Sequence, residues 1–167
     1  MNSVIHGENF FTQKKVAEAK FAQFFRIFQK RDNALEILSV HGDMAFNMQL
    51  SASVPETATF IRLSQRLRDY RSKARFGLVF YALSLATEAN VNTILEDLCY
   101  CRILLRPGGF LFIPTEKNRS RCVIKRFTGQ QSKESLWLRQ AGFMKIRDQR
   151  VKNKVIFVGG QRPLQKF

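Results

Sequence analysis

The sequence predicts an α/β domain with a mostly parallel sheet, an antiparallel C-terminal edge and helices on both faces. Apolar runs that fit buried strands alternate along the chain with segments that fit helices. A Pro-Gly-Gly sequence separates a helix-like segment from the apolar run at residues 110–113. Two strand-like segments close the chain around a short basic turn, which is typical of an antiparallel pair.

An amphipathic helix is expected near the N-terminus, over residues 13–29. Its apolar side chains recur at spacings of three and four, and lysines and arginines fill much of the rest. Phe21, Phe24 and Phe28 belong to this apolar stripe. The stripe can pack on the sheet or enter a groove on a partner.

Two apolar runs in the first half of the chain, residues 34–40 and 76–83, are expected to be buried strands. Between them, residues 57–63 fit either a strand or the start of a helix. The charged residues 63–71 fit a helix. The pattern at residues 46–50 is too short to assign.

The second half is expected to begin with a helix over residues 91–105, which the sequence Arg-Pro-Gly-Gly ends. Gly108 and Gly109 permit a tight reversal into the strand at 110–113, because glycine has no Cβ. A helix and two paired strands are expected to follow, at residues 132–140, 143–148 and 155–159.

Composition indicates a folded domain with a strong positive charge. The chain has 167 residues, of which 45% are hydrophobic, and its formal net charge is +15. We expect residues 1–31 to form a helix packed on the domain that residues 32–167 form. Such a charge attracts nucleic acid, an acidic protein or an anionic membrane surface, although a solvated basic face is the alternative.

Cysteine usage and apolar run lengths bear on the compartment. Cys99, Cys101 and Cys122 form no paired pattern, so we expect free thiols, no metal site and a reducing compartment. No apolar run is long enough to span a bilayer. Residues 12–31 are similar to a mitochondrial presequence but include an acidic residue. A cytoplasmic location is therefore expected, and a mitochondrial one is the alternative.

Four pieces of the second half occur in the order found in class I S-adenosylmethionine methyltransferases. They are FGLVF at 76–80, LRPGG at 105–109, FLFI at 110–113 and AGF at 141–143. From Phe76 onward the chain therefore resembles the second half of that family. The resemblance implies a Rossmann-like, methyltransferase-type sheet, shortened relative to full methyltransferases.

The first half departs from this family at the cofactor loop. Active members carry a sequence of the form E-x-G-x-G-x-G, whose glycines let the backbone approach the cofactor. Here Glu36 and Gly42 match, but Leu38 and Val40 stand at the first two glycine positions. A β-branched valine tolerates positive φ badly and fills space. The loop is therefore expected to be degenerate and to bind no cofactor; an active enzyme would use S-adenosylmethionine.

A second departure is the short segment that precedes residues 76–83. The family places two helix–strand units there, whereas residues 43–75 have room for about one. The strand whose terminal carboxylate holds the ribose hydroxyls is therefore expected to be short or missing. Tyr81 and Ser84 are the only candidates for catalytic side chains, and His41 has no evident partner, so no catalytic residue is assigned.

A compact methyltransferase-like domain with these losses is similar to the N-terminal domain of the anamorsin family. This resemblance implies a non-catalytic protein-interaction domain in cytosolic iron–sulfur cluster assembly, with a diflavin reductase as a candidate partner. The C-terminal iron–sulfur cysteines of that family have no counterpart after Pro163.

Two other functions remain open. The basic tracts at residues 66–75 and 117–121 favour an RNA-binding degenerate methyltransferase, as in a ribosome or RNA-processing component. An active S-adenosylmethionine-dependent methyltransferase with an unusual loop is the third possibility. The candidate partner-binding residues are Phe21, Phe24, Phe28, Arg66, Arg68, Arg71, Lys73 and Arg75.

Overall fold

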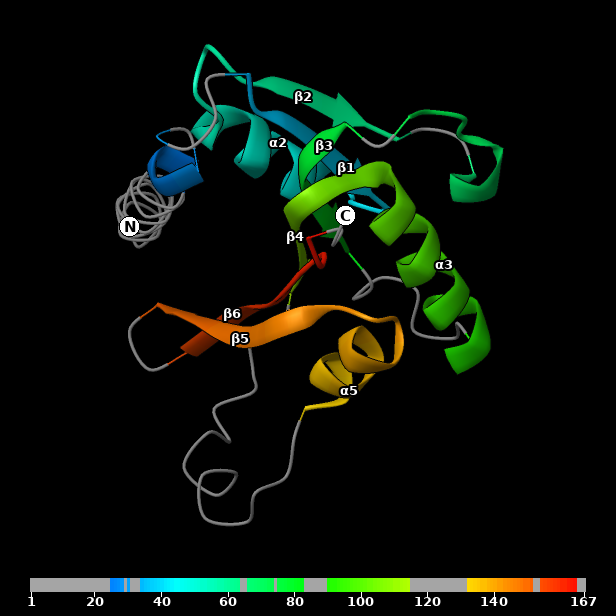
Figure 1. Cartoon of the computed structure of the whole chain (residues 1–167). Helices are drawn as coiled ribbons and strands as arrows, with labels where there is room; N and C mark the ends of the chain where they lie inside the picture. The colour runs from blue at the N-terminus through cyan, green and yellow to red at the C-terminus, as the bar shows by residue number, and fades with distance from the viewer. Residues whose placement is uncertain are drawn as a thin grey trace, which may run out of the picture.

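Six strands of the described residues form one sheet in a computed structural model of the chain (Figure 1). The structure describes residues 25–28, 30, 34–63, 66–73, 75–82, 90–114, 132–151 and 154–164. The strands are β1 (Glu36–Val40), β2 (Thr59–Arg62), β3 (Phe76–Tyr81), β4 (Leu105–Pro114), β5 (Met144–Val151) and β6 (Lys154–Gln161).

The first four strands run parallel and the last two run antiparallel to their neighbours. The strand order is β2-β1-β3-β4-β6-β5. β1 pairs in parallel with β2 and β3, and β3 pairs in parallel with β4. β6 pairs antiparallel with both β4 and β5. The predicted mostly parallel sheet with an antiparallel C-terminal edge is therefore confirmed.

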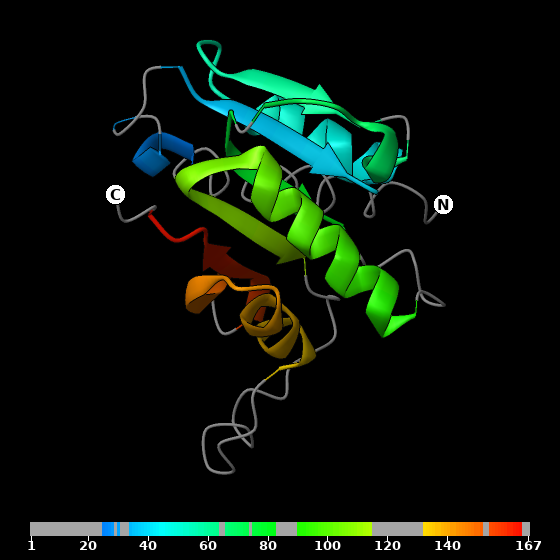
Figure 2. The same ribbon diagram turned by 45° about the vertical axis from the view of Figure 1, so that its right-hand side comes forward.

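Helices cover both faces of the sheet (Figure 2). α3 (Val91–Leu104) and α5 (Lys133–Gln140) contribute to the apolar layer on one face. α2 (Met44–Ser53) and a short helical segment at residues 25–28 contribute to the layer on the other face. The helices predicted over 91–105 and 132–140 are confirmed, and residues 46–50 lie within α2.

Strand residues alternate between these two layers. Leu38 and Val79 belong to the apolar cluster that includes α3, whereas Ile37 and Leu78 belong to the cluster that includes α2. This alternation is that of strands buried on both faces, which the continuous apolar runs in the sequence predicted.

The predicted N-terminal helix is described only at residues 25–28. There Phe28 packs edge-on against Phe110, with ring centroids 5.3 Å apart, and its side chain is half-buried. Phe28 therefore packs on the sheet. Phe21 and Phe24 lie outside the described residues.

The segment between β2 and β3 contains the main error of the sequence-based prediction. Residues 57–63, which fitted a strand or a helix start, contain strand β2, but within the described residues 66–71 of the expected helix only the 3-10 turn Leu67–Asp69 forms. Arg66 and Tyr70, on either side of that turn, have extended backbone. A segment with charged residues on all sides and a single fully buried anchor, Leu67, offers too little apolar surface to stabilise a helix by packing.

The Pro-Gly-Gly turn joins α3 to β4 as predicted, but the strand begins earlier than residue 110. β4 starts at Leu105, and its pairing register with β3 shifts at the turn, so the turn residues form a bulge. Gly108 has φ +78°, a conformation that side chains rarely adopt. Arg162 donates a hydrogen bond to the carbonyl oxygen of Leu105, which ties the C-terminal segment to this turn.

A helix that crosses a lipid bilayer needs about 20 consecutive, mainly apolar residues. None of the helices in the described ranges is both long enough and apolar enough to cross a membrane.

Candidate functional site

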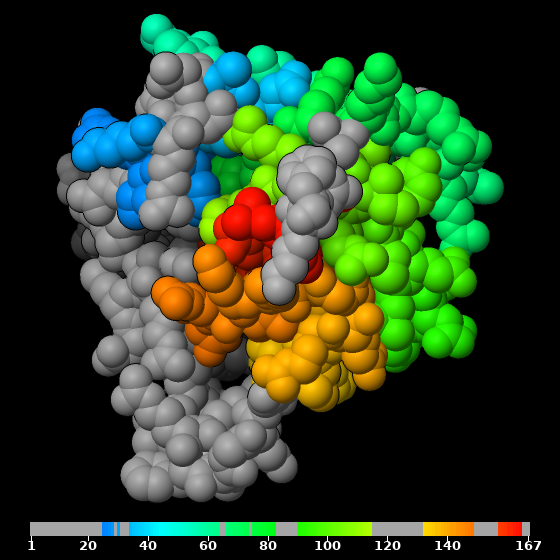
Figure 3. All heavy atoms as spheres, viewed as in Figure 1, coloured from blue at the N-terminus to red at the C-terminus, as the bar shows by residue number. Residues whose placement is uncertain are grey.

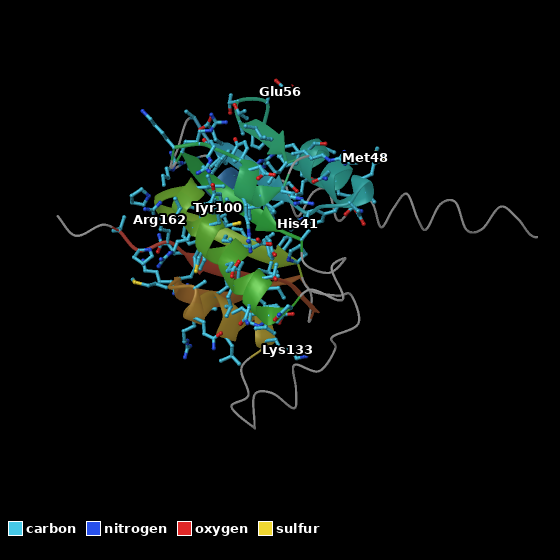
Figure 4. All side chains as sticks on the ribbon, turned by 90° about the vertical axis from the view of Figure 1, so that its right-hand side faces the viewer. His41, Met48, Glu56, Tyr100, Lys133 and Arg162 are labelled. Carbon is cyan, nitrogen blue, oxygen red and sulfur yellow. The ribbon has the colours of Figure 1, made fainter. Side chains whose placement is uncertain are left out.

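Open parallel sheets bind ligands beyond the carboxyl ends of their strands. In this chain, the ends of three neighbouring parallel strands carry Val40, Arg62 and Tyr81. Val40 and Tyr81 are paired in the register of β1 and β3. Figure 4 shows His41 at this end of the molecule and Arg162 at the opposite side. The candidate site is therefore the turn that follows β1, with the strand ends beside it.

Polar contacts fill the turn between β1 and α2. The Ser39 hydroxyl donates to Asn47 Oδ1 at 2.6 Å, and the Asn47 amide donates to the Gly42 carbonyl oxygen at 2.8 Å. A Cβ added to Gly42 would lie 2.6 Å from Asn47 Oδ1 and 2.8 Å from Ser39 Oγ. Gly42 is thus needed because helix α2 packs against the turn. His41 supplies the left-handed position, with φ 57°.

The N-terminus of α2 is capped by a side chain of the chain itself. Asp43 Oδ1 accepts a hydrogen bond from the backbone N–H of Phe46 at 2.7 Å. A free helix N-terminus behind a glycine loop favours an anionic group of a ligand. Here the Asp43 carboxylate already supplies the negative charge at that position, so a ligand carboxylate would meet repulsion.

Leu38 and Val40 lie in strand β1, as the strand predicted over residues 34–40 requires, so their assignment to positions of a cofactor loop is wrong. Both side chains are fully buried in the apolar cluster that includes α3. The strand continues through Val40 because its apolar run pairs with β3 as far as Tyr81. Glu36 begins β1 and forms an ion pair with Arg75, with 3.6 Å between Arg75 Nε and the Glu36 carboxylate.

A histidine, an aspartate and a tyrosine meet beside this turn. Asp97 Oδ2 accepts a hydrogen bond from the Tyr81 hydroxyl at 2.7 Å, and it lies 3.3 Å from His41 Nε2. The His41 side chain is 45% exposed and that of Asp97 is 11% exposed. The network joins the turn after β1, the end of β3 and helix α3. His41 therefore has a partner, contrary to what the sequence indicated.

Burial and hydrogen bonding set the ionisation of this network. Burial alone would raise the pKa of Asp97, but the hydrogen bonds from His41 and Tyr81 and the nearby positive charges lower it below its usual value. Burial, together with the hydrogen bond to Asp97, raises the pKa of Tyr81 far above its usual range. At neutral pH the network therefore contains an Asp97 carboxylate and a neutral tyrosine that donates to it.

Asp97 was not predicted from the sequence, and neither were the polar residues of the turn, Ser39, Asp43 and Asn47. Asp97 comes 56 residues after His41 in the chain, so no local pattern connects the two. One signal was available, because Asp97 falls between Ile94 and Cys101 on the apolar stripe of α3. A carboxylate on the buried side of a helix requires a hydrogen-bond partner.

The end of β2 lacks the carboxylate that a ribose-binding strand carries. β2 is present, parallel to β1 and four residues long, so the predicted shortening is correct. Its last residue is Arg62, which is exposed, and Leu63 follows it. Neither side chain supplies a carboxylate. Ser84, the other candidate catalytic residue, lies outside the described residues.

The candidate basic residues lie on the extended segment that follows β2. Arg68 forms an exposed ion pair with Glu96, and Arg75 is paired with Glu36 as described above. The remaining three candidates are exposed, and within the described ranges no acidic side chain lies within ion-pair distance of them. These three are Arg66, Arg71 and Lys73.

A hollow of about 340 Å³ lies at the other end of the sheet. Phe28, Arg106, Gly108 and Leu164 are among the residues that line it. It adjoins the amino ends of β3 and β4, away from the carboxyl ends where ligands of parallel sheets bind. Partial burial lowers the pKa of Arg106. The hollow is therefore separate from the candidate site.

The two described cysteines are free thiols on α3. Cys101 is buried, which raises the pKa of its thiol, and Cys99 is half-buried. Cys122 lies outside the described residues. A search of the described part of the chain finds no cluster of three or more His, Cys, Asp or Glu side chains that could hold a metal ion.

Comparisons with known proteins address the fold. No protein-family model matches the sequence, and no curated protein matches it. Solved structures do match. One is Burkholderia thailandensis 1,6-didemethyltoxoflavin-N1-methyltransferase with bound 1,6-didemethyltoxoflavin and S-adenosylhomocysteine. The sequences are 14% identical, the TM-score is 0.53, and the match covers 95% of this chain and 83% of that protein. Another is the N-methyltransferase NodS from Bradyrhizobium japonicum WM9. The sequences are 10% identical, the TM-score is 0.52, and the match covers 88% of this chain and 97% of that protein.

The chain spans less than half of some methyltransferases that it resembles. It covers 43% of the S-adenosylmethionine-dependent methyltransferase SibL, at 16% identity and a TM-score of 0.49. Identities this low show a shared fold and nothing further. The two structures with TM-scores above 0.5 show that the chain has a small class I methyltransferase-like fold. Between β1 and β3 the described residues form one helix–strand unit, α2 and β2.

Proposed function

We propose that this chain is a non-catalytic methyltransferase-like domain that acts by binding a macromolecular partner. The observation that carries the proposal is the turn after β1, where Ser39, Asn47 and the capping Asp43 occupy the space around the only glycine. A cofactor loop needs bare backbone at this point. The described residues at this end of the sheet therefore do not fit S-adenosylmethionine.

The end of β2 supports the same proposal independently of the turn. A carboxylate at the end of this strand would accept hydrogen bonds from the ribose hydroxyls. Arg62 stands there and can only donate. The cofactor would lose both its backbone cradle and its ribose acceptor, and we derive no methyl-transfer step for this chain.

Calorimetry with S-adenosylmethionine and S-adenosylhomocysteine tests the proposal. We expect no saturable heat with the full chain up to ligand concentrations of about 1 mM, the weak end of specific binding. The variant Arg62→Glu restores a carboxylate at the end of β2 without touching the core. It should also fail to bind, because the turn remains filled. Saturable micromolar binding by the unmodified chain would overturn the proposal.

The partner in this proposal is a protein, and the anamorsin resemblance makes a cytosolic diflavin reductase the first to try. Support for a protein partner comes from the outer edge of β2, which no described strand covers. Reconstitution of iron–sulfur cluster assembly with and without the chain tests this finer proposal, since a docking domain should change the rate of electron delivery. An unchanged rate would rule out the diflavin reductase as the partner, but it would not contradict the broader proposal of a binding domain.

RNA is the second candidate partner, on the observation that Arg66, Arg71 and Lys73 are exposed on one extended segment. If several of them contact phosphates, the affinity should fall by about one power of the salt concentration for each contact. Titration of a single-stranded RNA at several salt concentrations checks this. Binding that is absent, or that does not respond to salt, would exclude RNA.

A further inference from the structure

β2 forms an open edge of the sheet. It pairs with β1 on one side, and the described residues place no strand on its other side. The methyltransferase resemblance implies a sheet that continues at this position through a second helix–strand unit, and the described residues between β2 and β3 form no such unit. Figure 1 shows β2 along the top of the molecule, and Figure 3 shows the segment after it on the outside of the molecule at the upper right.

The backbone of β2 presents hydrogen-bonding groups to this open side. Thr59 N–H donates to the Leu35 carbonyl oxygen, and Leu63 N–H donates to the Ser39 carbonyl oxygen, both at 2.9 Å. Alternate residues of a strand point their backbone groups to opposite sides. The N–H and C=O groups between these two donors, at Phe60 and Arg62, therefore point away from β1.

The side chains of β2 leave that edge accessible. Phe60 packs partly into the apolar layer on the α2 side, and Ile61 packs partly into the layer on the α3 side. Both side chains thus lie above and below the sheet and not over its rim. The side chains of Thr59 and Arg62, at the two ends of the strand, are exposed.

The charge around the edge selects the partner. From Arg62 to Arg75 the sequence contains six basic residues and one acidic residue, Asp69. Two of the basic side chains are neutralised by ion pairs with Glu96 and Glu36. The rest give the open edge a positive rim, which attracts an acidic segment and repels a second copy of a chain whose formal net charge is +15.

We propose that the open edge of β2 binds an extended acidic segment of a partner protein, which adds a strand to the sheet. This inference rests on the proposed function, since it names the surface and the partner of the same binding domain. A polypeptide strand offers alternating N–H and C=O groups that match those of Phe60 and Arg62. Single-stranded RNA binds best where exposed aromatic side chains can stack on its bases. In the described ranges, none of the large exposed apolar side chains is aromatic, which favours a protein partner.

A synthetic peptide in which glutamate and valine alternate serves as the probe, and fluorescence anisotropy with the full chain measures its binding. A matched peptide with lysine in place of glutamate is the control. We expect the acidic peptide to bind, with an affinity that falls as salt rises, and the lysine peptide not to bind. Failure of the acidic peptide, or equal binding of both peptides, would overturn the proposal.

Two variants separate backbone pairing from charge. Arg62→Ala removes the side-chain charge, whereas Arg62→Pro removes the charge and also the outward N–H. Proline is tolerated on an edge strand where its N–H would face solvent. We expect Arg62→Pro to bind the peptide about threefold to tenfold more weakly than Arg62→Ala, the effect of one hydrogen bond. Equal affinities of the two variants would mean that charge alone holds the peptide.

If Arg62→Pro does not fold, hydrogen exchange in the unmodified chain tests whether the peptide pairs with β2. The amide hydrogens of Phe60 and Arg62 should exchange more slowly when the acidic peptide is added. Slowing elsewhere but not at these two amides would overturn the assignment of the edge. Displacement of the peptide by polyuridine would identify RNA as the partner, and dimerisation of the chain in sedimentation would identify a second copy. Neither result would bear on cofactor binding, which calorimetry tests separately.

Discussion

The turn after β1 and the outer edge of β2 lie on neighbouring strands, yet one is closed and the other is open. At the turn, the Ser39 hydroxyl donates to Asn47, the Asn47 amide donates to the Gly42 carbonyl oxygen, and Asp43 caps α2. At the edge, the backbone of Phe60 and Arg62 faces outward beside exposed arginines. Under the proposed function, the cofactor position at the turn is closed, and the open edge of β2 is the surface that binds a partner.

The largest effect is expected when glycines replace Leu38 and Val40 in β1, the strand that leads into the closed turn. The double variant Leu38→Gly, Val40→Gly removes two fully buried side chains from the layer under α3. We expect it to lose more than about 4 kcal/mol of unfolding free energy in urea, because each core truncation costs several kcal/mol. Met48→Gly, at a side chain on α2 that is 62% exposed, is the matched control and should lose about 1 kcal/mol. A stable double variant that binds S-adenosylmethionine would contradict the account.

The next effect is expected at Gly42 itself. Gly42→Ala places a Cβ 2.6 Å from Asn47 Oδ1, so the buried hydrogen bond from Ser39 to Asn47 must shift. We expect a loss of about 2 kcal/mol in unfolding free energy, in the range for overpacking a tight contact. Urea unfolding measures it. A neutral substitution would mean that the turn has room to move, and hence room for a ligand.

Asp97, on α3, accepts the hydrogen bond of the buried Tyr81 hydroxyl next to the closed turn. Asp97→Ala removes the acceptor of the Tyr81 hydroxyl and leaves that buried donor without it. We expect a loss of about 1–3 kcal/mol, the cost of an unsatisfied buried polar group. Adding Tyr81→Phe should restore part of that loss, because the donor is then gone as well. Strictly additive losses from the two substitutions would show that the hydrogen bond is not formed.

The pH dependence of stability follows from the same carboxylate. The folded pKa of Asp97 lies below its unfolded value of about 4, so its contribution is present above that pH and is lost as the pH falls through the folded pKa. We expect Asp97→Asn to flatten the acid side of the stability curve. Equal slopes for the variant and the unmodified chain would mean that Asp97 ionises as in water.

The smallest effect is expected on the open side, at the exposed pair of Arg68 and Glu96. Both side chains are about 60% exposed, and pairs of this kind contribute about 0–1 kcal/mol. Glu96→Gln should leave the unfolding free energy nearly unchanged while freeing Arg68, so that the acidic peptide binds slightly more tightly. A large loss of stability would show that the extended segment depends on this pair and is not simply a carrier of exposed charge.

The sheet could be predicted from the sequence because its signals are local. Residues 34–40 and 76–83 are apolar runs, and the Pro-Gly-Gly sequence marks the end of α3. The extended segment after β2 could not be predicted, because its charged sequence fits a helix and only the burial of Leu67 against α3 decides otherwise. Local propensity is a weak guide where tertiary packing supplies most of the stability.

The candidate site was only partly predictable. Counting residues correctly indicated a shortened middle. The apolar run at residues 34–40 correctly predicted a strand, but the family motif assigned Leu38 and Val40 to a loop, because a motif fixes sequence positions and not where a strand ends. Asp97 and His41 are brought together by the packing of α3 on the sheet, which no single stretch of sequence encodes.

One pair of titrations of the isotopically labelled chain, followed by nuclear magnetic resonance, tests the contrast between the two regions directly. With S-adenosylhomocysteine, the account predicts no saturable shift of the Gly42 and Asp43 amide signals. With the acidic peptide, it predicts saturable shifts of the Phe60 and Arg62 signals. Saturable shifts at Gly42 on addition of S-adenosylhomocysteine would show that the closed turn admits the cofactor and would contradict the central claim.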